Sequence, residues 1–194
     1  MTDPSSPVRY AIDGRIATVT LARPPLNVLD LAAIRALDAA LARAADENAS
    51  VVVLRSDGTR VFCAGVSVQD HDPVAIPETL RAFHSVFRRM YHAPYVTIAG
   101  VRGRCLGGGC ELALFCDITV AADNARFGLP EIDLPCFPPL ALSAFPYRFG
   151  RRALELVLTG ETIDAQAALE AGPPSPWAPR GDPPPHRTPP PQPP

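Results

Sequence analysis

The chain has 194 residues, a formal net charge of −2, and a composition that is 47% hydrophobic and 20% charged. This length is enough for one domain with a substantial buried core, and the near-neutral charge argues against binding to nucleic acid or to a membrane surface. No stretch approaches the ~18 apolar residues of a membrane span, and the N-terminal MTDPSSPVRY lacks the apolar segment of a secretion signal. We therefore expect a cytoplasmic protein.

The N-terminal part predicts a β-hairpin followed by a helix. YAIDGRIATVTLA (10–22) reads as two strands around a two-residue turn at Asp13 and Gly14. Asp30 is a suitable N-cap for a helix over LAAIRALDAALARAA, because the apolar residues that follow it recur at helical spacing.

Strands and helices alternate through the middle of the chain. The β-branched run at 51–56 is typical of a buried parallel strand, and an amphipathic helix is expected over 77–91. A second buried strand at 95–101 leads into a glycine turn and a short helix, and a third strand follows at 118–122. The segment TIDAQAALEAG predicts a helix that ends at Gly172. This alternation indicates an α/β fold.

The composition changes abruptly after this last helix. Residues 173–194 contain half of the 24 prolines and little that could form a core, so we expect disorder or polyproline II there. The sequence thus predicts a folded domain over 1–172 and a proline-rich tail over 173–194. An R-x-x-P-x-x-P spacing in the tail is typical of ligands of proline-recognition domains, but so many prolines also produce it by chance.

The five cysteines form no C-x-x-C pair: Cys63, Cys105, Cys110, Cys116 and Cys136. Several of them lie in apolar segments, so we expect reduced, buried side chains that act as small hydrophobic residues. Their spacing does not fit a structural zinc site, and no metal is expected.

The stretch CLGGGCELALFCD (105–117) places three glycines before a short apolar helix that contains Glu111. Glycines let a backbone approach a ligand closely, and the free N–H groups of a helix start suit an anion or a developing oxyanion. If the helix is buried, the pKa of Glu111 should rise toward the range of a general acid or base. A solvent-facing glutamate after a packing turn would explain the same residues equally well.

Two other segments have related features. FCAGVSVQD (62–70) is a second turn of small residues after a strand, and FGLPEIDL (127–134) places Glu131 behind a proline after the third strand. Carboxylates that follow successive strands can converge at the edge of a sheet where open α/β folds bind ligands. Taken alone, Glu131 fits an exposed loop better.

Three segments together resemble the crotonase (enoyl-CoA hydratase/isomerase) superfamily: FCAGVSV, GRCLGGGCELALFCDITVAADNARFGLPEIDL and LVLTGETIDAQAALEAG. They follow the family's order between Val8 and Gly172, and the middle segment is highly specific. The resemblance implies a crotonase-like ββα spiral core that assembles as a homotrimer or hexamer. It also implies an enoyl-CoA hydratase of fatty acid metabolism, although isomerases and thioester hydrolases share this fold.

The resemblance also assigns residues. The amides of Val66 and Gly108 would form an oxyanion hole for the thioester carbonyl, and Glu111 and Glu131 would be the two catalytic glutamates of family hydratases. RPPLNVLD resembles the segment that helps to hold the adenine end of coenzyme A, and the loop from Val66 to Gln69 would line the same ligand. No cofactor is implied beyond the coenzyme A of the substrate. The implied substrate- and CoA-binding residues are Leu26, Ala64, Gly65, Val66, Ser67, Val68, Gly107 and Gly108.

Two departures from the family pattern bear on function. Phe137, Pro138 and Pro139 replace small residues after the second glutamate, which predicts a bulkier, drier acyl pocket and resembles hydratases of alicyclic dienoyl-CoA thioesters; ordinary drift is the alternative. Family members also continue past Gly172 with C-terminal helices that build the trimer and complete the CoA site. The proline-rich sequence in their place indicates a shifted reading frame or a truncated gene. An inactive fragment is therefore an alternative to an active enzyme.

Overall fold

The structure is a computed structural model that describes residues 6–68, 74, 76–134 and 136–171. The predicted tail therefore lies outside the described residues. None of the helices within these ranges has the length and apolar character needed to cross a membrane. In chain order the elements are β1 Val8–Asp13, β2 Ile16–Leu21, α1 Leu31–Asp46, β3 Val51–Ser56, β4 Val61–Cys63, α2 Ile76–Tyr91, β5 Val96–Val101, β6 Arg104–Leu106, α3 Gly108–Phe115, β7 Ile118–Ala121, β8 Arg126–Gly128, the 3-10 helix η2 Pro130–Asp133, α4 Pro139–Phe149, α5 Arg151–Thr159, β9 Thr162–Asp164 and α6 Ala165–Ala171.

The strands form two sheets, and the chain alternates between them. One sheet has the order β1-β2-β3-β5-β7 and the other the order β4-β6-β8-β9. β3, β5 and β7 belong to the first sheet, and each is followed by a strand of the second. α2 follows β4, and α3 follows β6. This repeat of two strands and a helix confirms the α/β, ββα spiral fold.

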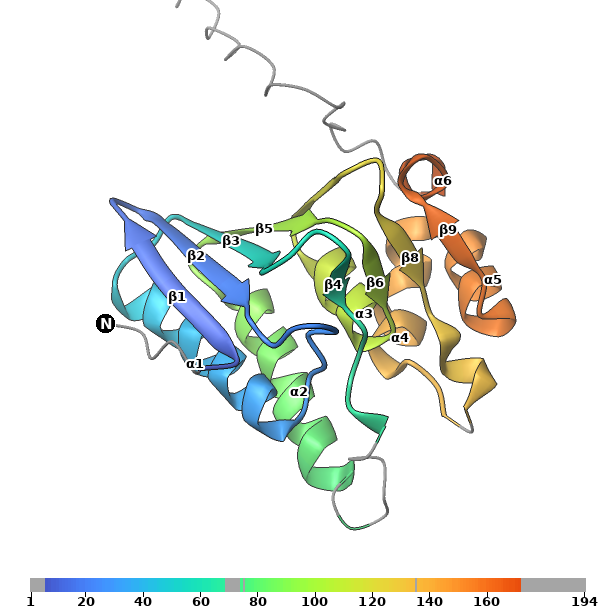
Figure 1. The fold of residues 1–194 in the computed structure, drawn as a ribbon, viewed down its shortest axis with the longest axis horizontal. Coiled ribbons are helices and arrows are strands. Elements are labelled where there is room, and N and C mark those ends of the chain that lie inside the picture. Colours follow the sequence, from blue (N-terminus) through green and yellow to red (C-terminus); the bar gives the residue numbers. More distant parts are fainter. Residues whose placement is uncertain (1–5, 69–73, 75, 135, 172–194) are drawn as a thin grey trace, which may run out of the picture.

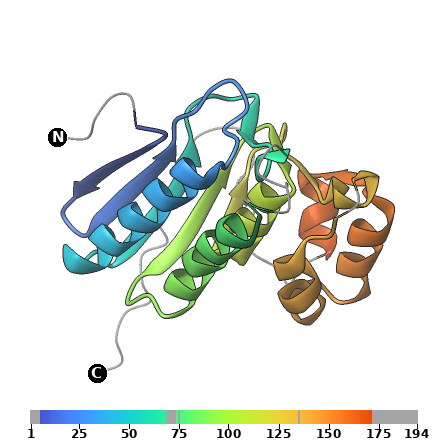
Figure 2. The same ribbon diagram turned by 90° about the horizontal axis from the view of Figure 1, so that it is seen from below.

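The first sheet contributes buried residues to the core from β1, β2, β3 and β5. β1 and β2 form the predicted antiparallel hairpin, whereas β2, β3, β5 and β7 pair in parallel. α1 and α2 lie side by side along one face of this sheet (Figures 1 and 2). Asp30 caps α1 as predicted, because its Oδ1 accepts a hydrogen bond from the N–H of Ala33 at 2.8 Å.

The hairpin turn differs from the prediction by one residue. Asp13 pairs with Ile16, so Gly14 and Arg15 form the two-residue loop. Gly14 has a φ of 55°, a conformation that glycine adopts without steric cost. Asp13 remains in β1 because its backbone completes the ladder with β2.

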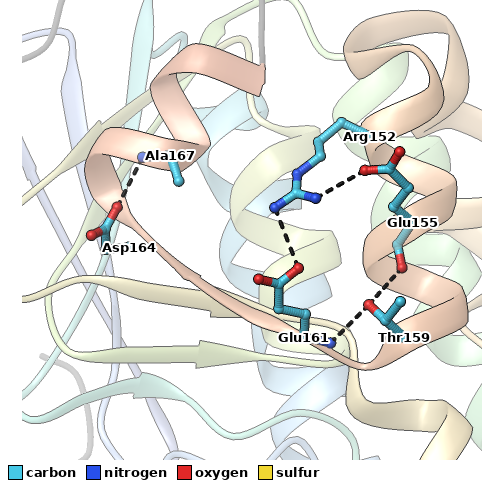
Figure 3. Close-up of polar contacts among 6 residues, drawn as sticks. All are labelled: Arg152, Glu155, Thr159, Glu161, Asp164 and Ala167. Atoms are coloured by element: carbon cyan, nitrogen blue, oxygen red, sulfur yellow. Dashed lines mark hydrogen bonds and ion pairs between the residues drawn. The ribbon is translucent and has the colours of Figure 1, made fainter.

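The predicted C-terminal helix begins later than expected. Residues 162–164 form β9, which pairs antiparallel with β8 and places buried Ile163 opposite Phe127. The helix α6 starts at Ala165, where the side chain of Asp164 accepts a hydrogen bond from the N–H of Ala167 at 2.8 Å (Figure 3). Its predicted end at Gly172 lies outside the described residues. The short second sheet as a whole was not predicted.

Candidate active site

Three parallel strands of the second sheet end at one edge, and the predicted site residues follow them. β4 leads to Val66, β6 leads to Gly108, and β8 leads to Glu131. β6 pairs in parallel with both β4 and β8. Because the carboxyl ends of parallel strands lie at the same edge, the fold brings these three positions together. The convergence predicted for the glutamates is thus correct, although Glu131 follows β8 and not the strand at 118–122.

The glycine turn is built so that α3 begins directly at the end of β6. Gly107 has a φ of 53° and donates its N–H to the C=O of Gly128 in the neighbouring strand at 2.9 Å. The first hydrogen bond of the α3 ladder joins the N–H of Glu111 to the C=O of Gly107 at 3.0 Å. The N–H groups of the first helical turn, which starts with Gly108, therefore have no carbonyl of their own helix to bind.

Val66 lies beside this helix start, and its N–H points away from segment 26–29. Leu29 forms a parallel β-bridge with Val66. The N–H of Leu29 donates to the C=O of Gly65 at 2.9 Å, and the C=O of Leu29 accepts from the N–H of Ser67 at 3.0 Å. A bridge of this kind uses the groups of the flanking residues and leaves the N–H of Val66 pointing away from Leu29. A Cβ added to Gly108 would lie 2.8 Å from the Cγ2 atom of Val66, so the Val66 side chain packs directly against Gly108.

Glu111 is buried, with an exposed fraction of 2%. Its Oε1 accepts a hydrogen bond from the N–H of Ala141 at the start of α4, at 2.8 Å. Burial raises the pKa of Glu111 to about 7, and the nearby charge of Glu131 adds to the rise, whereas the hydrogen bond from Ala141 opposes it. The structure excludes the solvent-facing alternative and confirms the predicted direction of the pKa shift.

Glu131 reaches the site from η2, a short turn that begins with a proline. Its Oε1 lies 2.9 Å from the position that a Cβ on Gly107 would occupy, and its Oε2 is buried. The absence of a side chain at Gly107 therefore makes room for this carboxyl group. Glu131 is not a fully exposed loop residue, because it lines the same cavity as Glu111.

The cavity between these elements has a volume of about 110 Å³. Its walls include both glutamates, both proposed amide positions, and the residues after Glu131 that depart from the family pattern, Phe137, Pro138 and Pro139. The remaining lining residues are mostly apolar: Ala64, Gly65, Val68, Leu80, Phe83, Gly107, Pro130, Leu134 and Cys136.

Most of the predicted substrate- and CoA-binding residues line this cavity: Ala64, Gly65, Val66, Val68, Gly107 and Gly108. Leu26 and Ser67 are not among the lining residues. Leu26 is 48% exposed, and Ser67 is buried next to Leu29. Gln69, which was expected to line the same ligand, lies outside the described residues.

Sequence reasoning missed the wall that α2 contributes. Phe83 is 2% exposed, and its Cζ atom lies 3.0 Å from where a Cβ on Gly108 would be. Its ring packs edge-on against Phe87, which packs in the same way against Phe115. The sequence predicted an amphipathic helix over 77–91, but a pattern within one helix does not show which distant turn a buried ring contacts.

The cysteines are largely as predicted. Cys63, Cys105, Cys110 and Cys116 are buried, and Cys136 is half-buried at the cavity. Burial raises the pKa of the Cys63 thiol to about 12, so this thiol stays protonated at neutral pH. Within the described ranges, no group of three or more His, Cys, Asp or Glu side chains is placed to hold a metal ion.

The spiral of paired strands and helices, with two glutamates lining one cavity, is the arrangement expected of a crotonase-type protein. The profile of the enoyl-CoA hydratase/isomerase family matches residues 11–182, and the chain belongs to that family. It is 36% identical to cyclohexa-1,5-dienecarbonyl-CoA hydratase of Thauera aromatica over 176 residues, covering 89% of this chain and 68% of the relative. It is also 36% identical to 2,3-dehydroadipyl-CoA hydratase of Escherichia coli over 162 residues, covering 81% of this chain and 64% of that protein.

Solved structures agree with this assignment. An enoyl-CoA hydratase/isomerase family protein from Silicibacter pomeroyi superimposes with a TM-score of 0.81 at 31% identity, over 89% of this chain and 77% of that structure. An enoyl-CoA hydratase from Geobacillus kaustophilus gives a TM-score of 0.82 at 29% identity, over 87% and 66%. The chain spans about two thirds of the length of the curated relatives it matches.

Proposed function

We propose that this protein adds water across the 2,3 double bond of an enoyl-CoA thioester. The observation that carries the proposal is that Glu111 and Glu131 line one cavity together with the backbones of Val66 and Gly108. Amides at a helix start and at a strand end can stabilise the negative charge that develops on a thioester oxygen. Two carboxyl groups beside that position can supply both proton transfers of hydration.

The proposed reaction proceeds through an enolate. The N–H groups of Val66 and Gly108 donate to the thioester oxygen, and a water molecule lies between the two glutamates. Ionised Glu111 takes a proton from this water as the water oxygen bonds to the β-carbon, and protonated Glu131 gives its proton to the α-carbon. The proton held by Glu111 then passes to Glu131, which restores both groups for the next turnover. The product contains one additional water, and no metal or cofactor is needed beyond the coenzyme A of the substrate.

The environment of Glu111 supports its role as the base. Because burial raises its pKa to about 7, its carboxylate is a much stronger base than an exposed glutamate and is still substantially ionised at neutral pH. A catalytic pKa near the working pH combines the correct protonation state with a strong driving force for proton transfer.

We further propose that the acyl group is compact, with a cyclic dienoyl-CoA as the leading candidate. The cavity of about 110 Å³ is lined mainly by apolar side chains, which favours a small apolar acyl group over a long chain. Phe137, Pro138 and Pro139 on its wall add apolar surface. A relative at 36% identity is named for a cyclic diene substrate.

A mass-resolved assay tests the reaction. The purified full chain is incubated separately with crotonyl-CoA and with cyclohexa-1,5-dienecarbonyl-CoA, and the masses of the products are measured by mass spectrometry. Hydration adds the mass of one water to the thioester. A product of unchanged mass with a moved double bond would indicate an isomerase, release of free coenzyme A would indicate a thioester hydrolase, and no product from a folded protein would indicate an inactive fragment. Each of these three results overturns the proposal.

A further inference from the structure

Asn27 is a fully engaged polar side chain inside a segment that is otherwise a surface turn. It is 2% exposed and has a φ of 50°, a left-handed conformation that asparagine tolerates better than most residues. Its Oδ1 accepts from the backbone N–H of Arg23 at 2.9 Å. Its Nδ2 donates to the C=O of Val61 at 3.2 Å and to the C=O of Phe62 at 3.1 Å. One side chain thus ties its own turn to β4.

The two segments that Asn27 joins remain hydrogen-bonded as far as the proposed oxyanion hole. One residue before Asn27, the C=O of Leu26 accepts from the N–H of Ala64 at 3.0 Å. Two residues after it, Leu29 forms the β-bridge with Val66. Segment 26–29 therefore pairs with residues 64–67 like a short neighbouring strand, and the direction of the Val66 N–H depends on the position of this segment.

We propose that Asn27 is a positioning residue for the oxyanion hole. Its amide fixes segment 26–29 against the end of β4, and this segment sets the direction of the Val66 N–H. The expected change in kcat rests on the proposed hydratase function. The expected loosening of residues 64–67 rests on the hydrogen bonds alone. Because the side chain is buried and does not line the cavity, it acts through Val66 and not on the substrate.

The expected effect is on turnover more than on binding. The oxyanion interaction strengthens as charge develops in the transition state, and a displacement of about 1 Å at a reacting group can lower a rate ~10²-fold. A purely structural asparagine would instead lower the unfolding temperature and leave kcat of the folded fraction unchanged.

Asn27→Gly is the main test variant, because glycine keeps the positive φ and removes only the side-chain bonds. We expect kcat to fall about 10- to 100-fold, with KM changed less than about threefold. Asn48→Gly is the matched control, since Asn48 also has a positive φ, of 57°, and lies at the exposed end of α1; it should keep the kcat and KM of the unsubstituted protein. Asn27→Asp keeps the acceptor for Arg23, removes the donated bonds, and should act in the same direction if the glycine variant does not fold.

A readout without substrate separates this inference from the proposed function. Amide hydrogen exchange at 64–67 should accelerate at least about tenfold in Asn27→Gly and stay unchanged in Asn48→Gly, because hydrogen-exchange protection reports local opening of the backbone. If exchange accelerates but the unsubstituted protein hydrates no enoyl-CoA, the hydratase proposal fails and the structural role of Asn27 stands. If the unsubstituted protein is active and the folded Asn27 variants retain its kcat, the positioning role is wrong.

Discussion

The two glutamates face one cavity from regions of opposite character. Glu111 belongs to α3, where six of the eight residues are buried, and its carboxyl group is held by the first turn of α4. Glu131 belongs to η2, where none of the four residues is buried. One carboxyl group is thus fixed within the core, and the other is carried by a surface turn.

The difference places the two carboxyl groups of one cavity in unlike environments. Burial raises the pKa of Glu111 to about 7, whereas Glu131 lies on a turn with no fully buried residue, although its Oε2 atom is buried. The spiral fold explains this difference in burial. Successive repeats of the spiral place their strand ends at the same edge of the sheet, but β6 is followed by the buried helix α3 and β8 by the surface turn η2.

The largest expected effect comes from removing either carboxyl function. Glu111→Gln and Glu131→Gln should each lower kcat by a factor on the order of 10² to 10⁴, because general acid–base catalysis contributes that much, and should change KM little. Glu170→Gln on the exposed surface of α6 is the control. Steady-state kinetics with an enoyl-CoA that the unsubstituted protein hydrates measure the effect. Full activity of either site variant would show that its glutamate has no part in the mechanism.

A second prediction concerns stability and distinguishes Glu111 from ordinary glutamates. Its pKa rises from 4.5 to about 7 on folding, so the folded state holds its proton more tightly than the unfolded state. The associated stability is fully present below pH 4.5 and is lost as the pH rises through 7. Between about pH 4 and pH 8 the protein should therefore lose roughly 3 kcal/mol of unfolding free energy relative to Glu111→Gln. Urea unfolding of both proteins across this range measures the difference, and parallel pH curves would contradict it.

The sequence was most informative where a local pattern determines the structure. β-branched runs predicted β3 and β5, helical spacing predicted α1 and α2, and Asp30 marked the start of α1. The burial of Glu111 was an open question, because eight residues of α3 fit a buried or a half-exposed helix equally well. Packing against α4, from residues 30 positions away, decided it.

The second sheet could not be predicted by the same means. β4, β6, β8 and β9 have three residues each, too few for an alternating pattern to be distinguished from a loop. These strands form because neighbouring turns of the spiral place them side by side, which is tertiary information. Their ends position Val66, Gly108 and Glu131, so the residue patterns suggested only that these segments converge, and the role of each residue was assigned through resemblance to a family.

The third prediction tests the space that Gly107 leaves for Glu131. Gly107→Ala would place a Cβ 2.9 Å from the Oε1 of Glu131 at a φ of 53°, so we expect kcat to fall about tenfold or more, since small displacements of a catalytic group lower rates strongly. Gly14→Ala is a close control, with a φ of 55° and no atom within 4 Å of the added Cβ. Both variants should lose about 1 kcal/mol of unfolding free energy. Equal kcat values in the two variants would show that Glu131 does not need this space.

The smallest expected effect concerns the support behind Glu111. Arg148 joins the end of α4 to the end of α3, donating to the C=O groups of Leu114 at 2.8 Å, Phe115 at 3.0 Å and Cys116 at 3.1 Å. Lysine cannot reproduce this forked geometry, so Arg148→Lys should lower the unfolding free energy by about 1 kcal/mol.

The same substitution should loosen the hold of α4 on Glu111. The hydrogen bond from Ala141 lowers the pKa of Glu111, so weakening it should move the acidic limb of the kcat profile to higher pH. Arg152→Lys is the control, because Arg152 pairs only with the exposed Glu155 and Glu161 among the described residues (Figure 3), and exposed ion pairs contribute little. A limb that stays in place in Arg148→Lys would mean that α4 holds Glu111 through its N-terminal turn alone.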